Sequence, residues 1–75
     1  KIKIIQENNV LHISSSATLL NKVTVYDMLG RLLFEKNDID ALNTQINSLQ
    51  VQSQVILVQI KTIDNTITTI KIILK

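Results

Sequence analysis

Few side chains in this sequence can serve as an acid, a base or a nucleophile. His12 stands between Leu11 and Ile13, and three serines, Ser14 to Ser16, follow it. A serine nucleophile needs a base that a third group orients, and adjacent serines give no sign of that geometry. A lone histidine on the strand face opposite Leu11 and Ile13 most often faces solvent. The chain has no cysteine, so a thiolate nucleophile is excluded.

Oxygen ligands for a cation gather around Asn37, Asp38 and Asp40. A calcium loop also needs a glycine for its sharp turn and a glutamate further along, and both are missing at the required spacing. A polar turn accounts for these residues. We therefore predict no catalytic, cofactor-binding or metal-binding residue, and we do not expect the chain to be an enzyme.

The segment Val23 to Glu35 predicts a strand, a tight turn and a second strand around the only glycine of the chain. Valines alternate with Thr24 and Tyr26, the period of two that puts side chains on opposite faces of a strand. The pattern breaks before Gly30, which can adopt the positive φ of a sharp reversal, and Asp27 can accept hydrogen bonds from turn amides. We expect Arg31, after the turn, to pair with a carboxylate.

The 75 residues predict one small domain, in which 13 Ile, 10 Leu, 6 Val and 7 Thr favour packed β-strands. Segments of strand character recur at the rhythm of an immunoglobulin-like sandwich. They are Ile2–Ile5, Val10–Ser14, Val23–Asp27, Arg31–Lys36, Thr44–Asn47, Val55–Ile63 and Ile67–Leu74. We predict an all-β, immunoglobulin-like antiparallel sandwich of about seven strands.

Asparagine and aspartate must make the turns, because proline is absent and glycine almost so. The candidates are Asn8-Asn9, Asn21, Asn37-Asp38, Asn43 and Asp64-Asn65. Asp64-Asn65 is placed like a two-residue hairpin loop, in which both residues need a positive φ. We therefore expect the last two strands to be antiparallel neighbours.

Composition also excludes several partners. The net charge of +2 is scattered along the chain, and only two residues are aromatic, so we expect no nucleic-acid partner. The longest apolar runs, such as Val55 to Val58, are four residues long, whereas about 20 are needed to span a bilayer, so we predict no membrane span. Because the chain begins with Lys1 and not Met, we expect it to be excised from a longer secreted protein.

Three segments, in order along the chain, resemble parts of the type A C-terminal sorting domain of the type IX secretion system of Bacteroidetes. V-Y-D-M-L-G-R, from Val25 to Arg31, resembles that family's strand and turn of the form V-Y-D-x-x-G-R. The apolar strand from Val55 to Ile60 resembles its late strand. Thr69 to Lys75 is similar to its lysine-flanked aliphatic ending.

The resemblance implies that residues 1–75 form a single sorting signal at the C-terminus of a secreted cargo protein. Such a domain is recognised in folded form in the periplasm by the outer-membrane translocon, and the cargo ends at the cell surface or outside the cell. The implied partners are the translocon, the surface signal peptidase that removes many of these domains, and the N-terminal cargo of the same chain. Whether this domain is cleaved stays open.

Two segments are candidates for contact with the translocon: Tyr26, Asp27, Gly30 and Arg31 at the hairpin tip, and Lys71, Ile72, Ile73, Leu74 and Lys75 in the last strand. Turn chemistry by itself accounts for the residue types of the first segment. For the second segment, two interpretations stand as equal alternatives. Its lysines discourage unwanted strand pairing, or the translocon recognises the backbone of this strand. Pairing of open edges in a homodimer is also left open.

The alternative function is a generic immunoglobulin-like module, adhesive or carbohydrate-binding, within an extracellular protein. Such a module can lie anywhere in its parent protein, whereas a sorting signal must end it.

Overall fold

The computed structural model describes residues 1–8, 10–47 and 54–74, in which seven β-strands alternate with short connections. The strands are β1 (Ile2–Glu7), β2 (Val10–Ser15), β3 (Leu20–Asp27), β4 (Leu32–Lys36), β5 (Asn43–Ile46), β6 (Val55–Thr62) and β7 (Ile67–Ile73). Each lies at one of the positions predicted from the period-two pattern, with ends that differ by up to three residues.

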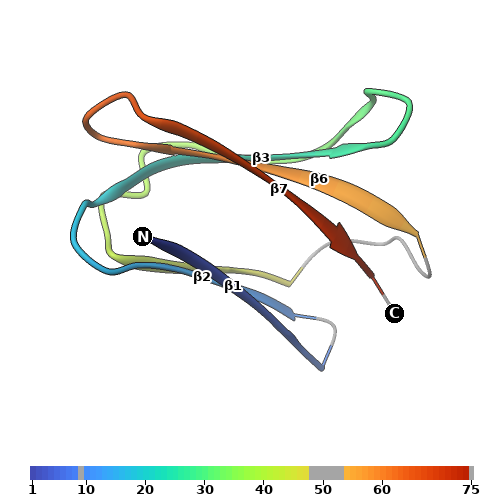
Figure 1. Ribbon diagram of the computed structural model, residues 1–75, viewed down its shortest axis with the longest axis horizontal. Coiled ribbons are helices and arrows are strands. Elements are labelled where there is room, and N and C mark those ends of the chain that lie inside the picture. Colours follow the sequence, from blue (N-terminus) through green and yellow to red (C-terminus); the bar gives the residue numbers. More distant parts are fainter. Residues whose placement is uncertain (9, 48–53, 75) are drawn as a thin grey trace.

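The strands form two antiparallel sheets packed face to face (Figure 1). One sheet has the order β1-β2-β5 and the other has the order β4-β3-β6-β7. The constant-type immunoglobulin sandwich pairs its first, second, fourth and fifth strands in one sheet. Here the fourth strand pairs with β3 in the other sheet instead. The two antiparallel sheets confirm the all-β sandwich predicted from the sequence, although their strand order differs from that of the constant-type immunoglobulin domain.

The core lies between the two sheets and consists almost entirely of aliphatic side chains. Alternate residues of the central strands point inward, as the period-two pattern predicts. The buried apolar residues are Leu11, Ile13, Leu20, Val23, Val25, Ile46, Ile56, Val58, Ile60 and Leu74. Each such side chain contributes about 1.5–3 kcal/mol on burial, so this cluster is the main source of stability.

Two of the residues expected in turns lie inside strands instead. Asn43 begins β5, and Asn21 lies within β3. The pairing of β3 with β6 shifts register between Leu20 and Lys22, so Asn21 occupies an irregularity of the ladder. The φ of Asn21 is not positive, and its carbonyl oxygen accepts a hydrogen bond from Ile39 N–H over 3.0 Å. Asn8 and Asp38 have the positive φ angles expected of turn residues, 53° and 52°.

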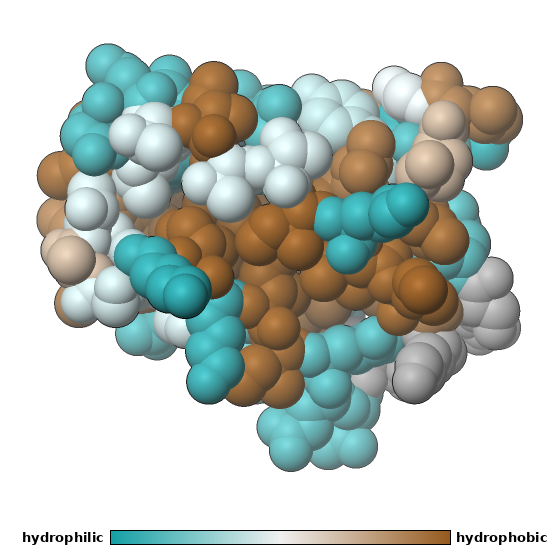
Figure 2. Space-filling view, in the orientation of Figure 1, coloured by the Kyte–Doolittle hydropathy of each residue, from teal (hydrophilic) through white to brown (hydrophobic). Residues whose placement is uncertain are grey.

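The two sheets are joined by polar contacts along one side of the sandwich, the closed side, and the opposite side is called the open side. On the closed side, Lys36 Nζ of β4 donates a hydrogen bond to Thr44 Oγ1 of β5 over 2.9 Å, and Leu20 forms an isolated bridge with Ala41. On the open side lie β1 and β7, which are each one of the two edge strands of their sheet (Figure 1). Figure 2 shows apolar residues gathered between them. The inward residues of these two strands, Ile2, Ile4, Ile70 and Ile72, are only partly buried.

Candidate functional site

A three-residue loop, residues 28–30, connects Asp27 to Arg31 in the hairpin of β3 and β4. Gly30 N–H donates to Asp27 O over 3.1 Å, and Asp27 N–H donates to Arg31 O over 3.0 Å. Gly30 closes the loop with a φ of 83°, in the left-handed region that favours glycine. The glycine thus has the role expected of it from the sequence.

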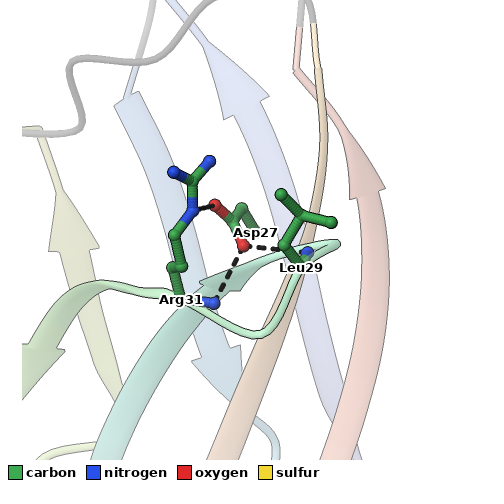
Figure 3. Close-up of polar contacts among 3 residues, drawn as sticks. All are labelled: Asp27, Leu29 and Arg31. Atoms are coloured by element: carbon green, nitrogen blue, oxygen red, sulfur yellow. Dashed lines mark hydrogen bonds and ion pairs between the residues drawn. The ribbon is translucent and has the colours of Figure 1, made fainter.

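The Asp27 side chain holds this loop from within (Figure 3). Its Oδ1 accepts hydrogen bonds from the N–H groups of Leu29 and Arg31, both over 2.9 Å. Its Oδ2 accepts a bond from Arg31 Nε over 2.6 Å, so Asp27 itself is the carboxylate that pairs with Arg31. The Asp27 side chain is only 5% exposed, and its partners replace the water that it loses.

These contacts favour the ionised form of the Asp27 carboxyl. The hydrogen bond from the Arg31 backbone N–H is the largest cause that lowers the pKa of Asp27 below its ordinary value, and the bonds from the Arg31 side chain and the Leu29 N–H act in the same direction. Burial opposes them and does not outweigh them. The loop is therefore held by charge-assisted hydrogen bonds from both sides of one carboxylate.

The same loop leaves its apolar side chains in solvent. Met28 is 57% exposed and Leu29 is 80% exposed, and Leu32 at the start of β4 is also exposed. Tyr26 is half-buried, and it pairs across the outer face of the sheet with Leu32 of β4 and Leu57 of β6. The hairpin tip thus combines a rigid backbone with an apolar surface.

The candidate residues of the sequence analysis do not include Met28 and Leu29. The available signal was the break in the period-two pattern between Asp27 and Gly30, because two apolar residues inside a tight turn cannot both reach a core. Asp27 and Gly30 themselves build the loop. Asp27 is buried within the loop, whereas Gly30 and Arg31 are exposed beside Met28 and Leu29.

The hairpin between β6 and β7 repeats this loop with different residues. Asn65 N–H donates to Thr62 O over 2.9 Å, and Thr62 N–H donates to Thr66 O over 3.0 Å. The expectation of a two-residue loop with two positive φ angles is wrong, because only Asn65 has one, at 67°. Thr62 and Thr66 bound a three-residue loop, in which Asn65 takes the place of Gly30.

This parallel predicts how Gly30 responds to substitution. We expect Gly30→Ala to destabilise the fold by about 1–2 kcal/mol, because alanine resists a positive φ, whereas no heavy atom lies within 4 Å of an added Cβ. Gly30→Asn should cost less than Gly30→Ala, because asparagine holds the equivalent position of the second hairpin. Urea unfolding of the three chains checks this order. Equal losses in the two variants would contradict it.

The second candidate segment, at the C-terminal end, divides between the two faces of β7. Lys71 is exposed, Ile72 is half-buried, and Ile73 is 64% exposed. Leu74 is only 5% exposed and belongs to the core, and its N–H donates to Gln54 O over 2.8 Å. Leu74 therefore cannot serve as a contact residue in the folded domain. Lys75 lies outside the described residues.

The remaining candidates for chemistry lie apart from both segments. His12 Nε2 is 4.0 Å from Glu7 Oε1, and the His12 side chain is 41% exposed. Asp38 and Asp40 both have positive φ angles, in the connection between β4 and β5. Across residues 1–8, 10–47 and 54–74, no three His, Cys, Asp or Glu residues lie close enough together to hold a metal ion. The same part of the chain has no helix long and apolar enough to cross a membrane.

The chain was compared with known proteins in two ways. A search of curated proteins finds no match. A family model described as "Domain of unknown function (DUF8694)" matches residues 1–74, nearly the whole chain. The chain therefore belongs to this family of domains of unknown function.

Proposed function

We propose that this domain is a C-terminal sorting signal, read as a folded unit by the outer-membrane translocon of the type IX secretion system. The cargo lies before it in the same chain, and it passes through the periplasm to the cell surface or the medium. The proposal starts from the resemblance of Val25–Arg31, Val55–Ile60 and Thr69–Lys75 to that class of domain.

The observation that carries the proposal is the rigid apolar tip of the β3–β4 hairpin. The side chains of Met28 and Leu29 project from a loop that Asp27 fixes with three hydrogen bonds. A fixed loop loses little conformational entropy when a partner covers it, and exposed apolar side chains are a typical anchor for protein recognition. A signal that is read in folded form needs such a preformed surface.

Within this proposal the residues of the tip have two different roles. Asp27, Gly30 and Arg31 set the shape of the loop, and Met28 and Leu29 make the contact. The pattern V-Y-D-x-x-G-R of the sorting domains thus specifies the residues that shape the loop. Its two variable positions, Met28 and Leu29 here, provide the exposed apolar side chains. Substitutions of the residues that shape the loop act through folding, and substitutions at the variable positions act on recognition alone.

Export of a reporter tests the proposal. Residues 1–75 are fused behind a reporter that carries an N-terminal export signal, in a strain with an intact type IX pathway. We expect the reporter in the medium or at the cell surface. Met28→Ser with Leu29→Ser should lower this export about tenfold or more, because a loss of two central apolar contacts weakens binding by that order. The melting temperature should not change, because both side chains are exposed.

A matched control is present in the second hairpin. Ile63 occupies the loop position equivalent to Met28 and is also exposed, so Ile63→Ser removes a comparable apolar side chain from the other loop. We expect Ile63→Ser to leave export unchanged. A reporter that stays in the periplasm with the unaltered domain would contradict the sorting function and favour the extracellular module. Normal export of the Met28 and Leu29 variant would contradict only the assignment to the tip.

A further inference from the structure

The backbone of β7 has one side paired with β6 and one side without a pairing strand among the described residues. Thr62 N–H donates to Thr66 O and Leu74 N–H donates to Gln54 O, and these two bonds bracket the β6–β7 ladder. Hydrogen-bonded and non-hydrogen-bonded pairs alternate in an antiparallel ladder. Thr68, Ile70 and Ile72 therefore direct their backbone groups toward β6. Ile67, Thr69, Lys71 and Ile73 direct theirs toward the open side.

This open edge has the composition of a strand that associates. Natural edge strands discourage pairing with charges, prolines or bulges. β7 has one charge, Lys71, and no proline, and its register with β6 runs without a shift from Ile67 to Ile73. The side chains of Ile67 and Ile73, at its two ends, are 57% and 64% exposed.

The sequence of β7 is complementary to itself in one register. In a two-fold pair of β7 strands centred on Ile70, Ile67 lies opposite Ile73 of the second copy and Thr69 lies opposite its Lys71. Every residue with outward backbone groups then faces another such residue. A pair centred on Lys71 would place two lysines opposite each other, which is unfavourable. A pair centred on Thr69 would leave Ile73 beyond the end of the second strand.

We propose that β7 is a homodimer interface, in which two copies of this chain pair their β7 strands antiparallel about Ile70. The two four-stranded sheets become one continuous sheet across the two-fold axis. On the outer face, Ile67 and Ile73 of each copy cover one another. On the inner face, the half-buried Ile70 of one copy meets Ile70 of the other on the open side of the sandwich, where apolar residues gather (Figure 2).

The other strand on the open side, β1, is less suited to this pairing. Ser16 N–H donates to Lys1 O, so by the same alternation Lys3, Ile5 and Glu7 face β2 with their backbone groups. Ile2, Ile4 and Gln6 remain for an outer partner. Two of the six residues of β1 are charged, and the chain reverses at Asn8, where φ is 53°. A β1 pair would therefore be shorter and more polar than a β7 pair.

The β7 interface is small. One pair of seven-residue edges buries less than the roughly 1,200–2,000 Å² of a standard stable interface, so the dimer is weak and reversible. Sedimentation velocity of the 75-residue chain from about 5 µM to about 1 mM should show the mass rising from that of a monomer toward twice that value. A chain that stays monomeric at the highest concentration overturns the proposal.

Thr69 supplies a matched pair of variants that reports the register. Thr69 is exposed, so neither Thr69→Lys nor Thr69→Glu should change the melting temperature measured at low concentration. Thr69→Lys places like charges opposite Lys71 twice in each dimer and should raise the dissociation constant about fivefold, whereas Thr69→Glu should lower it by a similar factor. Added salt should reduce both effects.

The remaining outcomes each decide against a part of this geometry. Weakening by both Thr69 variants would indicate a pair centred on Thr69 and overturn the Ile70 register. The Lys3→Glu variant alters only β1 and should leave the dissociation constant unchanged. Loss of the dimer in Lys3→Glu would place the interface on β1 and overturn the assignment to β7.

Discussion

At pH 7 we expect the Asp27→Asn chain to melt about 10 °C or more below the unaltered chain. The carboxylate accepts three hydrogen bonds while it is nearly excluded from water. An asparagine can accept the two backbone bonds with its oxygen, but its NH₂ group then faces Arg31 Nε, which is also a donor. A contact between two donors replaces the shortest hydrogen bond of the loop. Differential scanning calorimetry measures the change.

The loss should depend on pH in a direction that the Asp27 pKa fixes. Because folding lowers this pKa, the ionised carboxylate stabilises the fold above its unfolded value of about 3.9, and this stabilisation is lost as the pH falls through the folded value. The difference in melting temperature between Asp27→Asn and the unaltered chain should therefore be full at pH 7 and shrink below about pH 4. A difference that is independent of pH would show that charge is not its cause.

Asp64 in the second hairpin is a matched control for Asp27. Its Oδ1 accepts bonds from Thr62 Oγ1 and Thr66 N–H, and the Thr62 bond is the first cause that lowers the pKa of Asp64. Asp64 is exposed, so water can replace these partners. Asp64→Asn should shift the melting temperature in the same direction by much less than Asp27→Asn. An equal shift would mean that burial of the Asp27 carboxylate has no special effect.

The second large effect concerns two neighbours at the end of the chain. We expect Leu74→Ala to lower the free energy of unfolding by about 2–4 kcal/mol, because it opens a cavity in the core. A domain of this length has only about 4–11 kcal/mol in total. Ile73→Ala, one residue earlier and on the outer face, should cost about 0.5 kcal/mol. Urea unfolding of both variants measures the difference, and similar losses would contradict the placement of Leu74 in the core.

This difference determines how the last strand can be tested as a recognition element. A deletion from Lys71 onward removes Leu74 and part of the β6–β7 ladder, so loss of export in such a chain would report unfolding. Substitutions at Lys71 and Ile73 avoid this problem, because both side chains face solvent. They alter the outer surface of β7 without a change in the core.

Much of the hairpin site could be predicted because its contacts are local. The bonds that Asp27 accepts come from residues two and four positions later, and the φ of Gly30 belongs to the same loop. Such contacts depend on residue types and short spacings. The number of residues in the second loop was predicted wrongly, because it depends on the register in which Lys61 of β6 meets Ile67 of β7. Register is set by packing along whole strands, and the turn residues alone do not determine it.

About seven strands could be predicted from the sequence, and the described residues form seven, since the alternation of apolar and polar residues is a property of each segment separately. The packing of the sandwich was needed to show that β5 joins β2, that Leu74 is buried while Ile73 is exposed, and that β1 and β7 lie on the open side. Burial and strand pairing depend on segments that are distant in the chain, so one segment alone does not determine them. The alternation of apolar and polar residues indicates that the two faces of a strand differ. The packing of the two sheets decides which face enters the core and which edge stays open to a partner.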